Sequence, residues 1–567
     1  YDVAGHRDYL GEWQRGGTTA SFRLEWGDFD PFGRPGKVSR FSNNAFLRDE
    51  ALMTYVGESK VIRTQWIATS ATSGVPVEEA VQRVETFDEH GRLSKVEELS
   101  GGATAIATSY EYDVGNRLRR AMTPVSSGGN QIRWWKFDQR GFLASETVPE
   151  KGASGNGIVT YGDYDPLGNS GRRVDGGAEV VSTFDRAGRL VQVDEVVSGV
   201  NRPLKKFAFG ELNSVVGNET DYALGKLTSA IGYNWVVVGA SAFDARFVEG
   251  FRYKGTGGAR SERNVTFQFG AATTGTPPAN QPSYEQFMHQ EGFDALGQRS
   301  SIVYPKCIEL TYQCPAGQPS RTLETSYTNG FLATVSDESQ DWVTSATYHR
   351  SGLWATMGRG NGVVETQTQD ALAIARPAAI QASGASASWT SGAYSYDRSG
   401  NLTRLVGTDE GGNDLFLYDK VSRLKEARIQ VPTDRGDLLF ADGFESATSQ
   451  RWLEAWPPAG WSPGTKTQLF TFDRFGNLTQ VQTTGQATES FPTTEATNRM
   501  ASSIASYDDR GNLKTYDDGT TAFTNSFDAL NRQWKRLAPD GTDDYYLYTA
   551  DDERILTIED SAELQLQ

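Results

Sequence analysis

One short pattern governs what this chain can fold into: an aromatic residue, then Asp, two variable residues and Gly. Ten copies of the pattern have the glycine, and three have Asn or Ser in its place, which makes thirteen copies in 567 residues. The glycine copies begin at Tyr1, Phe29, Phe87, Phe137, Tyr164, Phe184, Phe293, Tyr396, Phe472 and Tyr507, and the other three begin at Tyr112, Tyr418 and Phe527. Self-similarity of this kind indicates a repeat architecture.

The spacing within the pattern predicts a β-hairpin turn. Asp at the first position of a type I turn accepts backbone N–H groups, and a glycine at the fourth position adopts positive φ and closes the hairpin through a bulge. Asn116 and Asn531 suit that conformation, whereas Ser422 fits it less well. The aromatic residue ends a strand. We therefore assign structural roles to nine triplets: Tyr1, Asp2 and Gly5; Phe87, Asp88 and Gly91; Phe137, Asp138 and Gly141; Tyr164, Asp165 and Gly168; Phe184, Asp185 and Gly188; Phe293, Asp294 and Gly297; Tyr396, Asp397 and Gly400; Phe472, Asp473 and Gly476; Tyr507, Asp508 and Gly511.

The distance between copies predicts one hairpin for each copy. Tyr164 and Phe184 are 20 residues apart, which is enough for two strands and a return loop. Where the pattern lapses, strand signals persist, as in the alternating segment 265–269. Evidence for helix is thin: segments 49–55 and 369–375 could each form a turn or two. The sequence therefore predicts an all-β protein.

Several repeat architectures could use such a unit. A propeller needs four strands per blade at a steadier period, a parallel β-helix has shorter repeats, and separate sandwiches need linkers. We prefer one long antiparallel sheet. If half of the residues lie in strands of about seven residues, there are roughly 40 strands, and open sheets rarely exceed about 10 without curling. We therefore expect a sheet that curls around a lumen or an open trough.

Composition excludes several classes of function. The formal net charge of −17 disfavours nucleic acid and anionic lipid as partners. Four histidines and two cysteines have no zinc-ligand spacing, and no apolar run approaches the ~20 residues of a spanning helix. The sequence has no Gly-x-Ser-x-Gly elbow, and no histidine lies near a candidate nucleophile. We expect no catalysis, no cofactor, no metal and no membrane span.

Two local features leave alternatives open. Cys307 and Cys314 are either a disulfide that closes a small hairpin or two free thiols. Residues 440–465 interrupt the repeats with Trp452, Trp456 and Trp461, which either pack against the sheet or offer a surface for sugars or a partner. The predicted organisation is therefore repeat sheet over 1–439, a Trp-rich insertion over 440–465, and repeat sheet again over 466–567.

The copies resemble the YD repeat of the Rhs family, which is also found in teneurins and in the B and C components of bacterial Tc toxin complexes. Segments 394–402, 418–424 and 221–227 are especially similar to bacterial members, and the resemblance runs from Tyr1 to about Leu556. It implies a hairpin sheet that spirals into a hollow YD-repeat shell, or β-cocoon, which encloses a C-terminal toxic polypeptide. It also implies a closing core with a self-cleaving aspartyl site, and nothing after Tyr548 has the expected Asp-Pro-x-Gly run.

The resemblance yields our functional expectation, a bacterial structural shell that shields a C-terminal cargo of the parent chain and meets secretion or delivery machinery. We expect it to be secreted or at the cell surface, and incomplete, because the chain begins at Tyr1 inside a repeat and the closing core is missing. The alternative is an extracellular adhesion protein that binds glycans or a protein partner.

Overall fold

The computed structural model describes an all-β chain. It describes residues 9–11, 22–42, 45–100, 103–152, 154–216, 218–238, 241–274, 284–307, 321–372, 374–385, 388–407, 412–431, 464–519, 521–539, 541 and 543–558. These residues form 45 strands and a single 3₁₀ turn, η1 (Thr256–Gly258). The predicted all-β fold of antiparallel hairpins is confirmed, and the strand number is close to that expected from length alone.

The chain divides into two compact units, each made of three sequence segments. Unit 1 comprises residues 1–111, 121–131 and 341–495, and unit 2 comprises residues 112–120, 132–340 and 496–567. These bounds differ from the predicted division at 440 and 466, which stays a prediction because residues 432–463 lie outside the described residues.

The strands of unit 1 are β1 (Tyr9–Gly11), β2 (Phe22–Gly27), β3 (Lys37–Ser42), β4 (Ala45–Val56), β5 (Lys60–Thr72), β6 (Val75–Phe87), β7 (Leu93–Ser100), β26 (Asp341–Tyr348), β27 (Trp354–Arg359), β28 (Val364–Gln369), β29 (Pro377–Ser383), β30 (Ser388–Thr390), β31 (Ala393–Tyr396), β32 (Leu402–Val406), β33 (Asn413–Tyr418), β34 (Leu424–Val431), β35 (Gly464–Phe472), β36 (Leu478–Thr483), β37 (Glu489–Ser490) and β38 (Thr493–Thr494). The unit boundaries fall in or beside β8 (Ala103–Tyr112), β9 (Leu118–Pro124) and β10 (Asn130–Phe137).

The strands of unit 2 are β11 (Leu143–Val148), β12 (Gly157–Tyr164), β13 (Ser170–Asp175), β14 (Ala178–Phe184), β15 (Leu190–Val197), β16 (Val200–Phe209), β17 (Ser214–Val216), β18 (Glu219–Asp221), β19 (Leu227–Val238), β20 (Ser241–Arg252), β21 (Glu262–Thr274), β22 (Tyr284–Phe293), β23 (Arg299–Cys307), β24 (Thr322–Thr328), β25 (Phe331–Ser336), β39 (Arg499–Met500), β40 (Ala505–Tyr507), β41 (Leu513–Asp517), β42 (Ala522–Phe527), β43 (Gln533–Leu537), β44 (Asp543–Tyr548) and β45 (Arg554–Ile558).

Within each unit, strands that follow one another in the chain pair antiparallel. In unit 2 this order runs from β10 to β16 and then from β19 to β25, with the small hairpin β17–β18 set apart. In unit 1, Asp49–Tyr55 belongs to β4, so the expectation of a helical turn there was wrong. Hydrogen-bonded pairing of β4 with β3 and β5 outweighs the weak helix propensity of such a short segment. In segment 369–375, residue 369 ends β28 and residues 371–372 form a turn, with no helix among its described residues.

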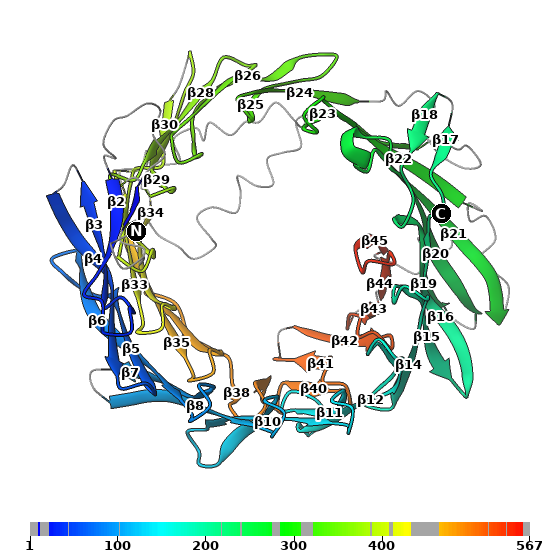
Figure 1. Cartoon of the computed structure of the whole chain (residues 1–567), viewed down its shortest axis with the longest axis horizontal. Helices are drawn as coiled ribbons and strands as arrows, with labels where there is room; N and C mark the ends of the chain where they lie inside the picture. The colour runs from blue at the N-terminus through cyan, green and yellow to red at the C-terminus, as the bar shows by residue number, and fades with distance from the viewer. Residues whose placement is uncertain are drawn as a thin grey trace. The chain divides into compact units, whose positions relative to one another are not determined.

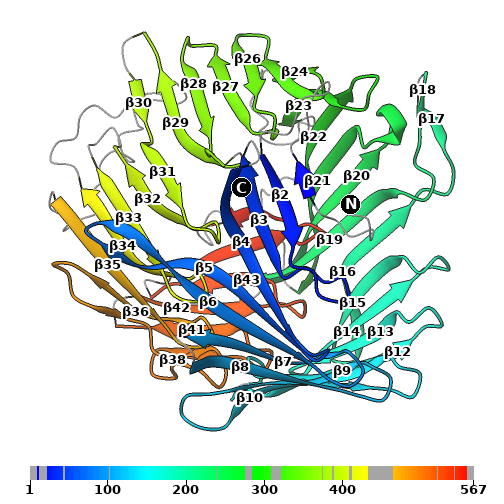
Figure 2. The same cartoon turned by 60° about the vertical axis from the view of Figure 1, so that its left-hand side comes forward.

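Each unit also contains a second, later sheet. In unit 1 this is the sheet β31–β37, and its strand β33 lies against β5 (Figure 2). In unit 2 it is the sheet β40–β45, and its strand β44 lies against β19, as the red and green strands of Figure 1 show. We call β31–β37 and β40–β45 the late sheets, and the earlier strands β2–β7 and β11–β25 the early sheets.

The early strands that receive a late sheet are unusually long. The strands β4, β5 and β6 have 12, 13 and 13 residues, and β19, β20 and β21 have 12, 12 and 13. Ordinary strands have about 5 to 6 residues. Extra strand length therefore provides the surface on which the late sheet packs.

Candidate functional site

The repeat turn is the structural element that recurs along the chain, and its two backbone hydrogen bonds are the same in every described copy. In the copy at Asp185, the Asp185 N–H donates to the carbonyl of Arg189 at 2.9 Å, and the Gly188 N–H donates to the carbonyl of Asp185 at 3.0 Å. One carboxylate oxygen accepts the N–H groups of Ala187 and Arg189, both at 2.9 Å, and the other accepts Nε of Arg189 at 2.7 Å. A single carboxylate thus fixes five residues of backbone.

The structure places the predicted repeat residues as follows. The copy at Tyr1, Asp2 and Gly5 lies outside the described residues. In the other eight triplets the aromatic residue is the last residue of its strand, namely Phe87, Phe137, Tyr164, Phe184, Phe293, Tyr396, Phe472 and Tyr507. The following glycines, Gly91, Gly141, Gly168, Gly188, Gly297, Gly400, Gly476 and Gly511, have φ between 74° and 96°. Asn116, Asn531 and also Ser422 have φ of 62° to 65°. The turn therefore forms even at the weakest copy.

The residue that follows the motif glycine links successive repeats, which sequence reasoning did not assign. The Arg189 guanidinium lies 4.2 Å from the Phe209 ring centroid, and the Arg423 guanidinium lies 4.9 Å from that of Phe472. Each ring ends the strand before the next turn. The signal was visible in the sequence, because Arg, Asn or Gln follows the glycine in most copies. Cation–π contacts of this kind stabilise exposed sites by about 0.5 to 1 kcal/mol.

At several turns the aromatic residue that ends the strand is a tyrosine whose hydroxyl adds a second link to the preceding repeat. The Tyr164 hydroxyl donates to the carbonyl of Leu143 at 2.6 Å, and the Tyr418 hydroxyl donates to that of Leu402 at 2.7 Å. The Tyr548 hydroxyl does the same with the carbonyl of Gln533 at 2.6 Å. In each case the acceptor is the first residue of a strand that follows a turn. These tyrosines therefore tie neighbouring hairpins together through a hydrogen bond that phenylalanine cannot make.

Hydrogen bonds within the turn lower the pKa of the carboxylates at Asp113, Asp165 and Asp185. The side-chain hydrogen bond from Arg117, with that residue's backbone N–H, lowers the pKa of Asp113. The side-chain hydrogen bond from Asn169 lowers the pKa of Asp165, and the backbone N–H of Arg189 lowers that of Asp185. These aspartates act as acceptors for the turn, which leaves little capacity for acid–base chemistry.

Several turns of the same shape lack the sequence pattern. At 210–226 the turn bonds form between Gly210 and Lys226 and between Gly225 and Gly210, and residues 211–224, which include β17 and β18, take the place of the two residues at the tip of an ordinary copy. The turns at His349 and Thr549 have the same bonds without the aspartate. The segments 348–352 and 548–552 are recognisable in the sequence only as weaker relatives of the motif, because the aspartate has been replaced.

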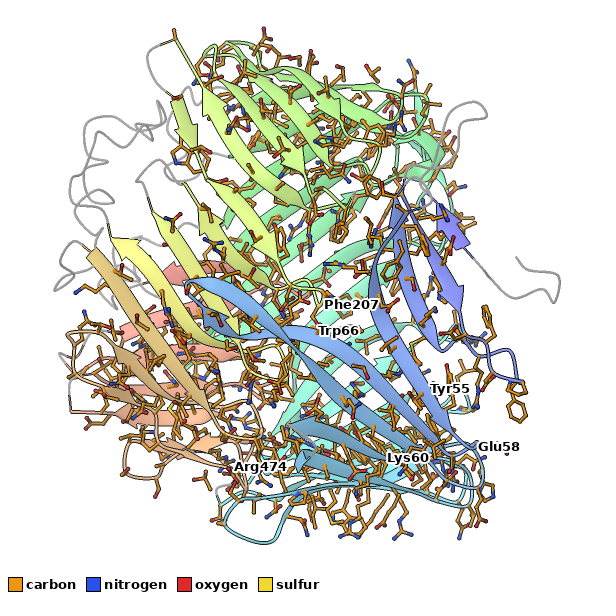
Figure 3. All side chains as sticks on the ribbon, turned by 90° about the vertical axis from the view of Figure 1, so that its left-hand side faces the viewer. Tyr55, Glu58, Lys60, Trp66, Phe207 and Arg474 are labelled. Carbon is orange, nitrogen blue, oxygen red and sulfur yellow. The ribbon has the colours of Figure 1, made fainter. Side chains whose placement is uncertain are left out.

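In unit 1 the late sheet docks through polar contacts. The Ala68 N–H in β5 donates to the Asp397 carboxylate at 3.1 Å, and Asp397 is 1% exposed. Arg398 pairs with Glu78 at 2.9 Å and lies 4.5 Å from the ring of Trp66, which is labelled in Figure 3. The next turn places the ammonium of Lys420 2.5 Å from the Glu79 carboxylate. We call the two residues between the motif Asp and the motif Gly the turn tip. Arg398 and Lys420 are turn-tip residues, and Asp397 is the motif aspartate, so all three contacts come from repeat turns.

In unit 2 the late sheet docks through buried apolar clusters in addition to ion pairs such as Lys205 with Asp552 and Arg263 with Glu553. Val236, Ala245, Phe247, Phe267, Tyr545 and Leu547 form one buried cluster; Val180, Val193, Leu204 and Ala529 form a second; Ala230, Phe251 and Ala550 form a third. Ala529 and Ala550 are turn-tip residues. Gly232 in β19 leaves room for the chain at Thr549, because a Cβ there would lie 2.5 Å from the Thr549 carbonyl carbon.

Asn234 joins the two sheets of unit 2 through its side-chain amide, which bonds both backbone groups of Tyr548. Its side-chain amide donates to the carbonyl of Tyr548 at 2.9 Å, and its side-chain oxygen accepts the N–H of Tyr548 at 2.8 Å. Asn234 is 5% exposed. It therefore supplies the pair of bonds that a neighbouring strand would supply.

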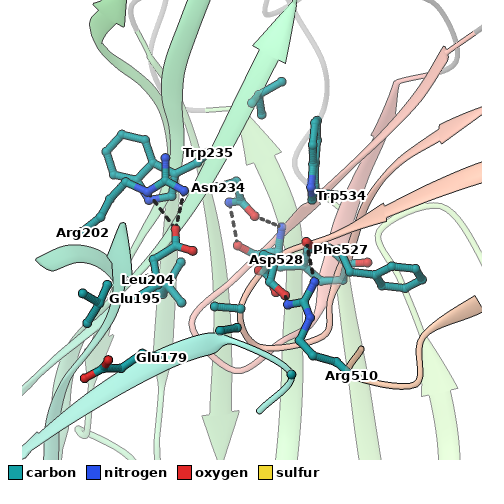
Figure 4. A pocket seen from close by; sticks show the side chains of 16 residues that line it. Glu179, Glu195, Arg202, Leu204, Asn234, Trp235, Arg510, Phe527, Asp528 and Trp534 are labelled. Carbon is teal, nitrogen blue, oxygen red and sulfur yellow. Dashed lines mark hydrogen bonds and ion pairs between the residues drawn. The ribbon is translucent and has the colours of Figure 1, made fainter. Parts of the chain in front are cut away.

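A cavity of about 380 Å³ lies between the sheets of unit 2, and Figure 4 shows the side chains around it. Trp235 and Trp534 form part of its wall, and Glu195 pairs there with Arg202. Burial raises the pKa of Glu195, which the Arg202 guanidinium opposes. The cavity's polar groups are largely committed to one another: Arg510, for example, donates to the carbonyls of Phe527 and Asp528. The cavity is thus a gap between two layers whose lining is already hydrogen-bonded.

The structure describes only part of the predicted cysteine pair and only the last two residues of the predicted Trp-rich insertion. Cys307 ends β23, but Cys314 and the tryptophans of the insertion lie outside the described residues, so the disulfide and the role of 440–465 stay predictions. Over the described ranges, no group of three or more His, Cys, Asp or Glu side chains is arranged to hold a metal ion. No described helix is long and apolar enough to cross a membrane.

Comparison with known proteins identifies the fold. No protein-family model and no curated protein sequence matches the chain. Among solved structures, the Tc holotoxin pore of Photorhabdus luminescens matches with a TM-score of 0.69 at 15% identity over 95% of this chain. The crystal structures of TcdB2-TccC3, and of TcdB2-TccC3 without its hypervariable C-terminal region, match with TM-scores of 0.67 and 0.68, also at 15% identity and 95% coverage. This chain spans 26% of the length of each matched chain. The fold expected from the YD-repeat resemblance is confirmed.

Proposed function

From its YD-repeat shell fold, we propose that this chain forms part of the wall of a hollow container around a cargo polypeptide. The single observation that carries the proposal is the structural likeness over 95% of the chain to toxin chains of the Tc class. The resemblance to the Rhs family gives the cargo its character, a C-terminal toxic polypeptide of the parent protein. One matched structure is described as lacking a hypervariable C-terminal region. We place the protein outside the bacterial cell or on its surface, in keeping with that class.

The mechanism that we propose is steric, with no catalysis by this segment. Main-chain ladders between successive hairpins, together with the turn aspartates and the residues that link each turn to the next, make a continuous wall. Such a wall excludes proteases and other macromolecules from what lies behind it. The support for a structural role is that the turn carboxylates, the most numerous candidate acids, each accept several hydrogen bonds within the turn.

Protease protection tests the proposal. The longest natural polypeptide that contains this chain is digested with trypsin under native conditions, and the cleavage sites are mapped by mass spectrometry. We expect peptides of the cargo to survive much longer than in the cargo expressed alone. Equal cleavage rates for enclosed and isolated cargo would contradict the container. The adhesion alternative depends on residues 440–465, and a glycan array that is positive for the chain and negative for Trp452→Ala would favour it.

A further inference from the structure

The turn tips of the early sheet in unit 2 form an exposed apolar edge. Alternate connections of an antiparallel meander lie at the same edge of a sheet, so the turns after β12, β16 and β22 share one edge. Leu167 and Leu296, both turn-tip residues, are 67% and 85% exposed. The inserted hairpin on this edge adds Leu212 and Val215, which are 78% and 70% exposed. Exposed apolar side chains gathered along one edge indicate an interaction surface.

Neighbouring turns hold this edge as one continuous structure. The side chain of Leu167 lies against the next turn, 3.0 Å from where a Cβ of Gly188 would stand. Lys226 donates to the carbonyl of Gly258, and Thr256 donates to the carbonyl of Asp294 at 2.8 Å. The edge is therefore ordered before any partner binds, so a partner would not need to order it.

The same chain shows what covers such turn tips. In the late sheets, tip residues pack on strands of another sheet with the same repeat. Ala529 and Ala550 are 7% and 1% exposed against early strands of unit 2, and Arg398 seats on β5 and β6 in unit 1. The surface that fits a repeat turn is thus the strand face of another hairpin-repeat sheet.

A copy of this chain also carries exposed strand residues of the required kind. Phe46 in β4 is 56% exposed, and Val77 in β6 is 42% exposed. Both lie on the long early strands of unit 1, the class of strand that receives turn tips elsewhere in the molecule. One copy therefore offers the tips, and another offers the strand face.

We propose that the turn-tip edge of unit 2, marked by Leu167 and Leu296, docks on the long early strands of a second copy of this chain. The two surfaces differ, so the contact is head to tail and extends to further copies as concentration rises. This inference goes beyond the container function and does not depend on it, because it rests only on how turns of this repeat are seated.

Sedimentation velocity of the purified chain from about 1 to 100 µM tests the inference. We expect the weight-average mass to rise with concentration, and Leu296→Glu and Leu167→Glu to weaken that association at least tenfold with unchanged thermal melting. The matched control is Val200→Glu, because Val200 is 67% exposed at the opposite edge of the same sheet, and it should associate as the parent does. Phe46→Glu should weaken association from the other surface.

A chain that stays monomeric over the whole range would overturn the proposal. Equal loss of association in Val200→Glu and Leu296→Glu would overturn it as well, because association would then follow net charge rather than the turn-tip edge.

Discussion

The two units solve the same packing problem with different chemistry. In both, a late sheet of hairpins is seated by its turns on unusually long early strands. Unit 1 uses a buried carboxylate and ion pairs, namely Asp397 on Ala68 and Arg398 on Glu78. Unit 2 has ion pairs as well, but adds small apolar tips such as Ala529 and Ala550 over buried clusters. The repeat therefore fixes the turn, whereas the tip residues are free to vary with the surface they meet.

The largest effect is expected from unit 2, where removing a docking side chain leaves a cavity. Leu547 is 1% exposed in the cluster that joins the sheets, so Leu547→Ala should lower the free energy of unfolding by about 2 to 5 kcal/mol. Leu537 on the neighbouring strand is 40% exposed, and Leu537→Ala should cost about 0.5 kcal/mol or less. Denaturant unfolding followed by tryptophan fluorescence measures both. Similar losses in the two variants would mean that the apolar clusters do not hold the late sheet.

In unit 1 the corresponding variant is Asp397→Asn. It replaces a carboxylate oxygen, which accepts two hydrogen bonds, by an amide group that cannot accept both. Oδ2 of Asp397 accepts both the Asn401 side-chain amide at 2.9 Å and the Ala68 N–H at 3.1 Å. We expect a loss of about 1 to 3 kcal/mol, because buried donors lose their partner. Asp473→Asn is the control, since Asp473 accepts the same two bonds from Asn477 that Asp397 accepts from Asn401, and the N–H of Phe475 in addition, but no bond from another sheet among the described residues. If both variants lost the same stability, the bond between the sheets would contribute nothing.

A smaller effect, and one that salt should remove, is expected for the ion pair between Lys420 and Glu79. The two side chains are 29% and 39% exposed, and pairs of this kind contribute about 0.2 to 1 kcal/mol. Lys420→Ala should therefore destabilise slightly in low salt and hardly at all in 1 M salt, where screening is nearly complete. Melting curves at the two salt concentrations show the difference. A loss that persists in high salt would indicate packing by the lysine stem instead.

The dependence of stability on pH should also separate the contribution of the turn aspartates from that of the buried Glu249. The pKa values of Asp113, Asp165 and Asp185 are lowered in the fold, so their stabilisation is complete above the unfolded value of about 3.9 and disappears as pH falls through the folded values. Burial, opposed by Arg263, raises the pKa of Glu249, so its contribution is present below about 4.3 and disappears as pH rises through the folded value.

Glu249→Gln should accordingly flatten the decline of melting temperature on the neutral side of pH 4.3. The exposed Glu179, whose pKa is lowered by the hydrogen bond from Arg172, is the control, and Glu179→Gln should leave that slope unchanged. Parallel pH profiles for the parent and Glu249→Gln would contradict the assignment.

The sequence predicted the local unit well and its assembly poorly. The turn depends on five consecutive residues, so the local pattern predicts it, and the turn forms even where Ser422 replaces the glycine. Docking depends on pairs that are far apart in the chain, such as Ala68 with Asp397 or Asn234 with Tyr548, and no local pattern marks them. The turn at Gly210 escaped notice because its carboxylate is absent and a hairpin is inserted. The length of strands such as β5 and β19 could not be predicted either, because it is linked to packing against a sheet that lies far away in the sequence.

Hydrogen exchange at the amide of Ala68 tests most directly whether repeat turns seat one sheet on another. The Ala68 N–H points from β5 to the Asp397 carboxylate of the late sheet. We predict slow exchange in the parent chain, and exchange at least tenfold faster in Asp397→Ala, with the amides of β5 that bond within the early sheet unchanged. Rapid exchange of Ala68 in the parent chain would contradict the account.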